Sequence, residues 1–218
     1  LQGRGVGACI KHFVCNDSEF QRHTISSEVG ERALRELYLR PFERALREAR
    51  PWSLMSAYNQ MNGAWCSENE FLLRDLLKGE WAFDGAVISD WFGTNSTVPA
   101  ANAGLDLEMP GPGQHFGPKL LEAVKRGDVA ESVLDDKARR LLRLAMRTGA
   151  FDAKPAEAER AIDRPEHRAL ARRAAQQAIV LLQNRDSVLP LDASTLSSLA
   201  VIGPNAHPGV SQGGGSSR

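Results

Sequence analysis

Short apolar runs alternate with longer amphipathic stretches along residues 1–149. The apolar runs predict buried strands, and they lie at 6–13 (VGACIKHF), 53–58 (SLMSAY), 85–91 (GAVISDW) and 104–109 (GLDLEM). The stretches between and after them predict helices at about 28–50, 68–81, 97–104, 117–126 and 129–148. Strands that alternate with helices indicate an α/β fold with a parallel sheet and right-handed crossovers.

Single residues predict where helices begin, divide and end. Ser27 is placed to cap the first long helix, and Pro41 must kink or divide that helix because it lacks a backbone N–H. Asp128 and Glu131 have the spacing of a capping box, and Gly149 is placed to end the helix that follows them.

The strand–helix units define the predicted domains. Residues 1–149 hold too few units for a complete (β/α)8 barrel, which typically has ~250 residues, but enough for its second, C-terminal half. Residues 150–164 are rich in alanine, charge and proline and are interpreted as a linker. In 165–218, a helix at 165–184 and a buried strand at 199–204 predict the start of a second α/β sandwich domain. Since the chain begins without a Met or signal peptide and stops at GGGSSR, we expect an internal piece of a longer polypeptide.

Composition narrows the classes of function. Hydrophobic residues make up 42% and charged residues 25% of the chain, as in folded globular proteins, and 27 basic residues balance 27 acidic ones. Zero net charge argues against nucleic acid or an anionic membrane as the partner, and no apolar run reaches the ~20 residues that span a bilayer. Cys9, Cys15 and Cys66 are too few and too scattered for a disulfide framework or a CxxC metal site. We expect reduced thiols, which fit a reducing compartment without establishing one.

The ends of the predicted strands carry the candidate chemistry, because parallel α/β folds bind ligands at the carboxyl ends of their strands. These ends hold a cation, an imidazole, a thioether, a phenol, an indole and carboxylates: Lys11, His12, Met55, Tyr58, Asp90, Trp91, Asp106 and Glu108. Such a mixture suits a sugar, whose hydroxyls need polar partners and whose ring faces need aromatic ones. A carboxylate can also attack or stabilise the cationic anomeric carbon.

The carboxylates each have a structural interpretation as well. Asp90 follows four apolar residues where the strand leaves the core, and it either carries the chemistry or caps the following turn. Asp106 and Glu108 compete for the same role, since alternation places both on one face of their strand. For these two, a structural hydrogen-bond or ion-pair ladder is favoured.

The neighbours Lys11 and His12 pose a geometric problem. Adjacent side chains of a regular strand point to opposite faces, so one buried His and one exposed Lys is the simpler interpretation. If both reach one ligand, the strand must be interrupted between them, and a non-proline cis peptide bond is one form of interruption. Met55 and Tyr58, taken alone, are more typical of core packing.

In order along the chain, KHF, LMSAYNQMNG, GAVISDW and GLDLEMPGP resemble glycoside hydrolase family 3 enzymes of the β-glucosidase type. The later AIVLLQNRDSVLPL, AVIGPNA and GGGS resemble the opening of that family's second domain, so the resemblance covers essentially the whole chain. It implies an exo-acting β-glycosidase that removes the non-reducing terminal sugar from a small carbohydrate or glycoside. The reaction would retain configuration through a covalent glycosyl–Asp intermediate and would need no cofactor or metal.

Carried over by matching residue, Asp90 of the SDW motif would be the nucleophile, with Tyr58 beside it. Residues that hold or line the −1 subsite would be Lys11, His12, Met55, Tyr58 and Trp91. The acid/base, usually a Glu of the second domain, would lie outside this chain, as would a sugar-gripping Asp and Arg of the first half-barrel. We therefore expect residues 1–218 alone not to be a working glycosidase, and to depend on the remaining parts of the parent polypeptide.

The loop after the first strand separates two branches of the family. The β-N-acetylglucosaminidase branch carries a KHFPGHG-type loop whose paired Asp and His supply the acid/base. Here the loop reads KHFVCNDSEFQRH, and its remaining histidine, His23, is interpreted as structural or surface. This difference favours the glucosidase branch.

Two other classes of protein stay as alternatives. VIGPNAHPGVSQGGGS suggests a nucleotide-binding α/β enzyme, but GPGQHFG does not match GxGxxG and the chain has no GxxxxGK. A non-catalytic carbohydrate-binding relative would keep the fold without activity. The presence of Asp90 together with its expected neighbours argues against it.

Overall fold

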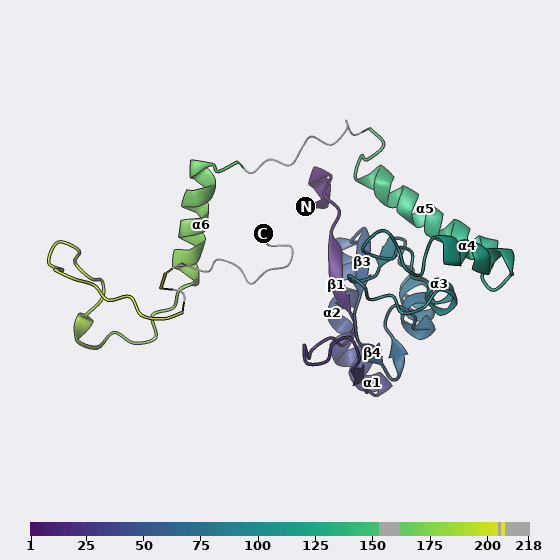
Figure 1. The fold of residues 1–218 in the computed structure, drawn as a ribbon, viewed down its shortest axis with the longest axis horizontal. Coiled ribbons are helices and arrows are strands. Elements are labelled where there is room, and N and C mark those ends of the chain that lie inside the picture. The colour runs from purple at the N-terminus through teal and green to yellow at the C-terminus, as the bar shows by residue number, and fades with distance from the viewer. Residues whose placement is uncertain (153–161, 205, 208–218) are drawn as a thin grey trace. The chain divides into compact units, whose positions relative to one another are not determined.

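A parallel sheet forms the centre of the first part of the chain, and its strands, in spatial order, are β1 (Cys9–Phe13), β3 (Ser53–Ser56) and β6 (Ala86–Ile88) (Figure 1). The middle strand aligns Leu54 with Ile10 on one side and with Val87 on the other. Each strand lies inside a predicted apolar run, so the first three predicted strands are confirmed.

These elements come from a computed structural model that describes residues 1–152, 162–204 and 206–207. The chain divides into two compact units, Leu1–Ala156 and Glu157–Arg218. The domain limits expected from the sequence stay predictions, because most of the predicted linker lies outside the described residues.

The fourth predicted strand is reduced to a single bridge between Leu107 and Ile88. The side chain of Asp106 gives the reason, since its Oδ2 accepts the N–H of Val87 at 2.8 Å. A regular parallel strand would bind that N–H with a backbone carbonyl. The prediction of a strand over 104–109 is therefore wrong beyond this bridge.

The first long helix is divided, as its proline predicts, and its parts are α1 (Glu31–Ala33), the wider π-type turn η2 (Leu34–Tyr38) and α2 (Arg40–Ala49). Pro41 lies in the first turn of α2, where a missing N–H costs nothing. The cap predicted at Ser27 is wrong, because its hydroxyl donates to the Cys15 carbonyl at 2.9 Å and Gly30 precedes α1.

A second, small sheet ties two loops together, and its strands are β2 (Ser26–Ser27), β4 (Gln60–Met61) and β5 (Ala64–Trp65). Asn62 and Gly63 join β4 to β5 with φ of 51° and 83°, as a two-residue hairpin turn requires. β2 pairs in parallel with β4 and so anchors the loop after β1 to the segment after β3. The Asn-Gly pair is a hairpin signal that the apolar pattern alone does not reveal.

The remaining predicted helices of this unit are present as η3 (Phe71–Glu80), α3 (Val98–Ala103), α4 (Pro118–Lys125) and α5 (Glu131–Arg147). Gly149, with φ of 72°, follows α5 and donates its N–H to the Met146 carbonyl, so the predicted helix end is confirmed. The predicted capping box is wrong. Ala130 precedes α5 without a side-chain cap, and the Asp128 carboxylate accepts from Arg126 at 2.8 Å instead.

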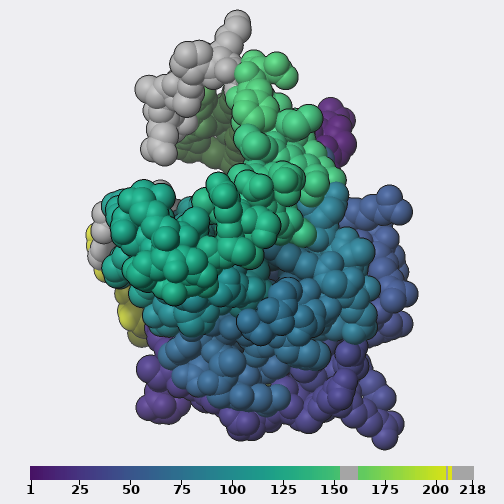
Figure 2. All heavy atoms as spheres, turned by 90° about the vertical axis from the view of Figure 1, so that its right-hand side faces the viewer, coloured from purple at the N-terminus to yellow at the C-terminus, as the bar shows by residue number. Residues whose placement is uncertain are grey.

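Leucines of η3 fill the core beneath the sheet. Phe13, Leu54 and Val87 point inward from the three strands and belong to one buried cluster with Leu72, Leu73, Leu76 and Leu77. Figure 2 views this unit from the side of α4 and α5, whose residues, teal to green, cover the upper part of that face. The polar carboxyl ends of the strands thus rest on a closely packed apolar core.

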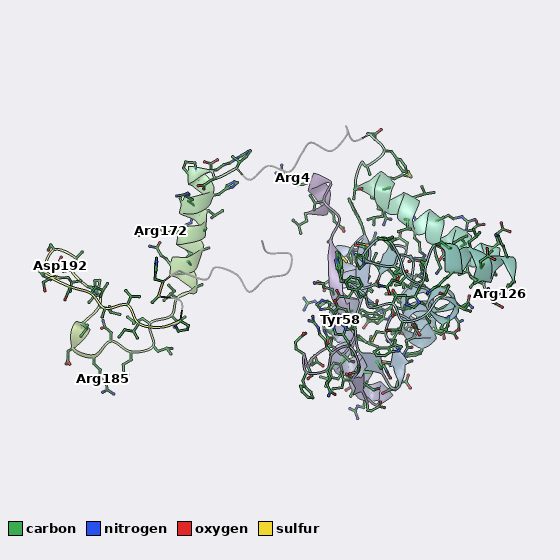
Figure 3. The ribbon with its side chains drawn as sticks, viewed as in Figure 1. Arg4, Tyr58, Arg126, Arg172, Arg185 and Asp192 are labelled. Carbon is green, nitrogen blue, oxygen red and sulfur yellow. The ribbon has the colours of Figure 1, made fainter. Side chains whose placement is uncertain are left out.

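The second unit contains α6 (Pro165–Ala178) and the short turn η4 (Arg185–Ser187). The helix predicted over 165–184 ends at Ala178, because Ile179, the first of two β-branched residues, is extended. The strand predicted at 199–204 is not formed, since within the described residues this segment pairs with no neighbour. Figure 3 labels three of this unit's exposed polar residues, Arg172, Arg185 and Asp192.

Candidate active site

The carboxyl ends of β1, β3 and β6 bring three of the predicted site residues together. His12 lies within β1, Tyr58 follows β3 and Asp90 follows β6. The Nε2 atom of His12 lies 3.2 Å from Oδ2 of Asp90, and the Tyr58 phenol is close enough for the same carboxylate to raise its pKa. Residues far apart in the sequence therefore meet around one carboxylate, as the strand-end argument predicts.

Asp90 is buried, with 8% of its surface exposed. Its Oδ1 accepts the N–H of Trp91 at 2.8 Å, while its Oδ2 faces His12. One oxygen therefore holds the turn, as the structural interpretation expects, and the other is directed at the imidazole.

The imidazole of His12 is a neutral donor. Burial lowers its pKa from the ordinary 6.5, and the positive charge of Lys11 lowers it further, while Asp90 opposes the shift. His12 is therefore uncharged near pH 7 and can donate its Nε2–H to Asp90.

The strand is interrupted where the sequence predicts. The peptide bond between Lys11 and His12 is cis, and the pairing of β1 with β3 shifts between Ile10 and Phe13. The expected non-proline cis bond is confirmed. Lys11 is exposed beside the half-buried His12.

Tyr58, labelled in Figure 3, is buried and its phenol is protonated. Burial raises its pKa above 10.0, and the negative charge of the Asp90 carboxylate raises it further. Met55 is buried in β3, aligned with Ile88 of β6, and Trp91 is 45% exposed next to Asp90. Tyr58 can therefore act as a hydrogen-bond donor and Trp91 as an open aromatic surface.

The loop after β1 adds residues that the sequence reasoning missed. The Arg22 guanidinium lies 4.9 Å from the centroid of the Tyr58 ring, and the His23 ring packs edge-on against Tyr58 at 4.2 Å. Arg22 also pairs with Glu19 at 2.6 Å. His23 is exposed, so its interpretation as a surface residue holds, but it contacts the site. The signal available in the sequence was an acidic and a basic residue at i,i+3 in a polar loop directly after a strand.

Asp106 and Glu108 have the structural roles that were favoured for them. Asp106 is 3% exposed and accepts from the Lys78 ammonium at 2.6 Å. The Glu108 carboxylate, 8% exposed, accepts backbone N–H groups of the loop that follows it. They bind different partners instead of forming one ladder, since the expected strand is absent.

The thiols take no part in this site. All three cysteines are free; Cys15 and Cys66 are buried and Cys9 is exposed. Burial raises the pKa of Cys15 to about 11 and that of Cys66 to about 12, so these two are not thiolates near neutral pH.

Two of the cavities that border this unit lie next to its strands. One of about 370 Å³ lies beside Lys11 and His12 and reaches Tyr38 behind β1. A larger one of about 740 Å³ lies at the opposite, amino ends of the strands and includes Trp52 and Asp84. The larger cavity contains none of the predicted site residues, so size does not identify the site.

Residues 1–152, 162–204 and 206–207 carry neither a metal site nor a membrane-spanning helix. Over these ranges, no group of three or more His, Cys, Asp or Glu side chains is arranged to hold a metal ion. In the same part of the chain, the helices are too short or too polar to cross a bilayer.

The chain matches a known protein family and several named relatives. The family model described as "Glycosyl hydrolase family 3 N terminal domain" matches residues 1–144. The chain is 52% identical over 218 residues to the β-glucosidase of Rhizobium radiobacter. The matched region is 100% of this chain and 26% of that protein. It is 49% identical over 225 residues to probable β-glucosidase J of Aspergillus fumigatus. The matched region is 99% of this chain and 25% of that protein.

A solved structure gives a similar result. The β-glucosidase of Kluyveromyces marxianus in complex with glucose superposes with a TM-score of 0.74 at 41% identity, over 87% of this chain and 24% of that one. The chain thus spans about a quarter of the length of the curated relatives that it matches.

Proposed function

Because the chain belongs to glycosyl hydrolase family 3, we propose that it supplies the nucleophile and part of the sugar site of a retaining, exo-acting β-glucosidase. The observation that carries the proposal is the buried carboxylate of Asp90 facing a neutral His12 at the carboxyl ends of the strands. The substrate would be a β-glucoside or a related small glycoside, from which the terminal sugar at the non-reducing end is removed.

The reaction would run in two displacements at the anomeric carbon. A carboxylate oxygen of Asp90 forms a bond to that carbon while the bond to the leaving oxygen breaks, and the leaving oxygen takes a proton from an acid/base outside this chain. Water then attacks the same carbon, gives a proton to that base, and breaks the ester bond to Asp90. Two inversions return the product to the starting configuration.

The neighbours of Asp90 have separate tasks in this scheme. His12 offers a hydrogen to the carboxylate without carrying positive charge, and the protonated Tyr58 phenol lies near it, so both would orient Asp90 while leaving its charge free to attack. As glycosyl ester forms, the carboxylate loses charge, and these interactions weaken without leaving an unpaired cation. Orientation of the nucleophile is therefore their main contribution.

The sugar itself would be held by groups around this core. Lys11 and Arg22 would donate to its hydroxyls, and the open indole of Trp91 would pack against an apolar ring face. Met55 would line the floor of the pocket from β3. This distribution places charge on the rim and apolar surface beneath it.

The test is a chimaera in which these 218 residues replace the matching quarter of the Rhizobium radiobacter β-glucosidase. We expect it to hydrolyse an aryl β-glucoside and to release β-glucose first, as followed by NMR before the anomers equilibrate. Release of α-glucose first would contradict retention. No hydrolysis by a folded chimaera, under conditions in which the unmodified enzyme is active, would contradict the function.

Residues 1–218 alone provide the second arm of this test. Without an acid/base and the rest of the sugar site, we expect no measurable turnover, since general acid catalysis alone contributes about 10²–10⁴-fold. Turnover within about tenfold of the chimaera would contradict this, because it would require an acid/base among the residues assigned here to structure.

A further inference from the structure

The turn that carries Asp90 is fastened to one residue, Met109, on both of its sides. Before Asp90, the buried hydroxyl of Ser89 accepts the Met109 N–H at 2.8 Å and lies 3.4 Å from the Met109 carbonyl. After it, Phe92 donates its N–H to the same carbonyl at 2.9 Å. The main chain of Met109 therefore bridges the two ends of the segment that holds the nucleophile.

Met109 is held in turn through its neighbour Glu108. The carboxylate of Glu108 accepts the N–H groups of Gln114, His115 and Phe116 at 2.9, 3.0 and 2.6 Å. In the described part of the chain its partners are backbone donors of one loop, so the carboxylate serves as the centre around which that loop closes.

Gly113 shows how closely the loop surrounds this carboxylate. A Cβ atom at Gly113 would lie 2.6 Å from Oε2 of Glu108, which is closer than van der Waals contact allows. A Cβ at Gly111, two residues earlier in the same loop, would meet no atom within 4 Å. An alanine at position 113 would therefore have to displace the Glu108 carboxylate or the loop around it, whereas an alanine at position 111 would not.

We infer that Glu108 and Ser89 are positioning residues that fix the Asp90 carboxylate through the main chain of Met109. The inference rests on the proposed function, since it assigns these residues to the reaction of Asp90. Neither side chain needs to touch the sugar or the reacting atoms. A nucleophile displaced by ~1 Å loses on the order of 10²-fold in rate. Loosening the turn that holds Asp90 should therefore lower the rate of the chemical step more than the affinity for the sugar.

The test measures covalent labelling of the chimaera by 2,4-dinitrophenyl 2-deoxy-2-fluoro-β-glucoside. The variants are Ser89→Ala, Glu108→Gln and Gly113→Ala. The matched controls are Ser53→Ala, a buried serine that bonds a backbone carbonyl at the other end of the sheet, and Gly111→Ala. Two quantities are read for each protein: the inactivation rate constant at saturation and the half-saturating concentration of the inactivator.

We expect the three variants to lose about 10- to 100-fold in the inactivation rate constant, with the half-saturating concentration changed by less than about twofold. The two controls should match the chimaera in both quantities. The double variant of Ser89→Ala with Glu108→Gln should lose less than the product of the single losses, because both act through Met109.

Two results would overturn the inference alone. One is a normal inactivation rate constant in folded variants, even with a lowered Tm, which would leave a purely structural role. The other is a change confined to the half-saturating concentration, which would place these residues in sugar binding. If Ser89→Ala does not fold, Glu108→Gln, which keeps the side-chain volume, decides the question. Failure of the unsubstituted chimaera to label would overturn the proposed function and this inference with it.

Discussion

Asp90 and Asp106 are both buried carboxylates beside a basic side chain, but the two basic partners differ. Asp106 lies 2.6 Å from the ammonium of Lys78. Asp90 lies 3.2 Å from the imidazole of His12. Lys78 comes from the helix η3, whereas His12 comes from the strand β1, and both carboxylates are less than one-tenth exposed.

The pKa values separate the two regions. Burial raises the pKa of Asp106, and the Lys78 ammonium opposes that shift with a full positive charge. Burial lowers the pKa of His12, so its imidazole brings no charge to Asp90 near pH 7. A carboxylate matched by a cation serves the fold, whereas a carboxylate oriented by neutral donors stays able to attack. The chemical role therefore follows from the partner and not from burial alone.

The largest expected effect separates the two aspartates directly. In the chimaera, Asp90→Asn should lower kcat by on the order of 10⁴–10⁶-fold, because the amide cannot form the glycosyl ester. The Tm should change little, since the Asn oxygen can still accept the Trp91 N–H. The measurement is kcat on an aryl β-glucoside together with a melting curve.

Asp106→Asn is the matched control, and it should retain most of the activity per folded molecule. A folded Asp106→Asn protein that loses as much kcat as Asp90→Asn would contradict the distinction between the two regions.

A stability measurement should show the opposite order. Lys78→Met leaves the Asp106 carboxylate buried without its cation and should cost about 3–5 kcal/mol, read as a lower urea midpoint. Arg32→Ala breaks a pair with Glu36 whose side chains are 87% and 61% exposed, and should cost less than about 1 kcal/mol. Equal losses from the two changes would show that the buried pair does not hold the Asp106 region.

His12 tests the neutral-donor half of the comparison. His12→Ala should lower kcat/KM by about 10²–10³-fold, the usual effect of losing one oriented donor in an active site. Because the pKa of His12 lies below 6.5, the imidazole stays neutral as the pH falls from 8 to 6.5, so the pH profiles of the chimaera and of His12→Gln should be parallel there. An acid limb at or above pH 6.5 that His12→Gln abolishes would contradict a neutral imidazole.

The smallest expected effect concerns Lys137, a buried ammonium next to Asp106 that donates to the carbonyls of Ala101 and Leu105. Burial lowers its pKa from 10.5 to about 8, so between these values the unfolded chain binds more protons than the folded one. Stability should therefore rise with pH through that window, and the Tm of the chimaera should gain on that of Lys137→Met between pH 8 and 10. A Tm difference that stays constant or shrinks over this range would show that Lys137 is not buried as a strained cation.

The sequence predicts the strand ends well, because an apolar run marks burial whatever the exact pairing. Asp90 and His12 come together since β1 and β6, which flank β3, run parallel and carry them at the same end of the sheet. The cap and capping box fail for a physical reason. Ser27 and Asp128 have suitable spacing, but other partners bind their side chains: the carbonyl of Cys15, in an earlier segment, and the neighbouring Arg126.

The parts that sequence reasoning missed are set by contacts between distant segments. Arg22 reaches Tyr58 only because β2 draws the loop after β1 against β4, a pairing of two residues that no periodicity announces. The strand expected at 104–109 is lost because the Asp106 side chain replaces a backbone carbonyl. In both cases one side chain or a very short ladder decides the geometry, and average propensities do not register it.

The central claim is that Asp90 is the nucleophile, and mass spectrometry of the labelled chimaera tests it most directly. Asp90, Asp106 and Glu108 lie together in the tryptic peptide 79–119, so fragmentation of that peptide must place the 2-deoxy-2-fluoroglucosyl group on one residue. The account predicts the label on Asp90. A label on Asp106 or Glu108, or a fully inactivated protein without a covalent sugar, would contradict it.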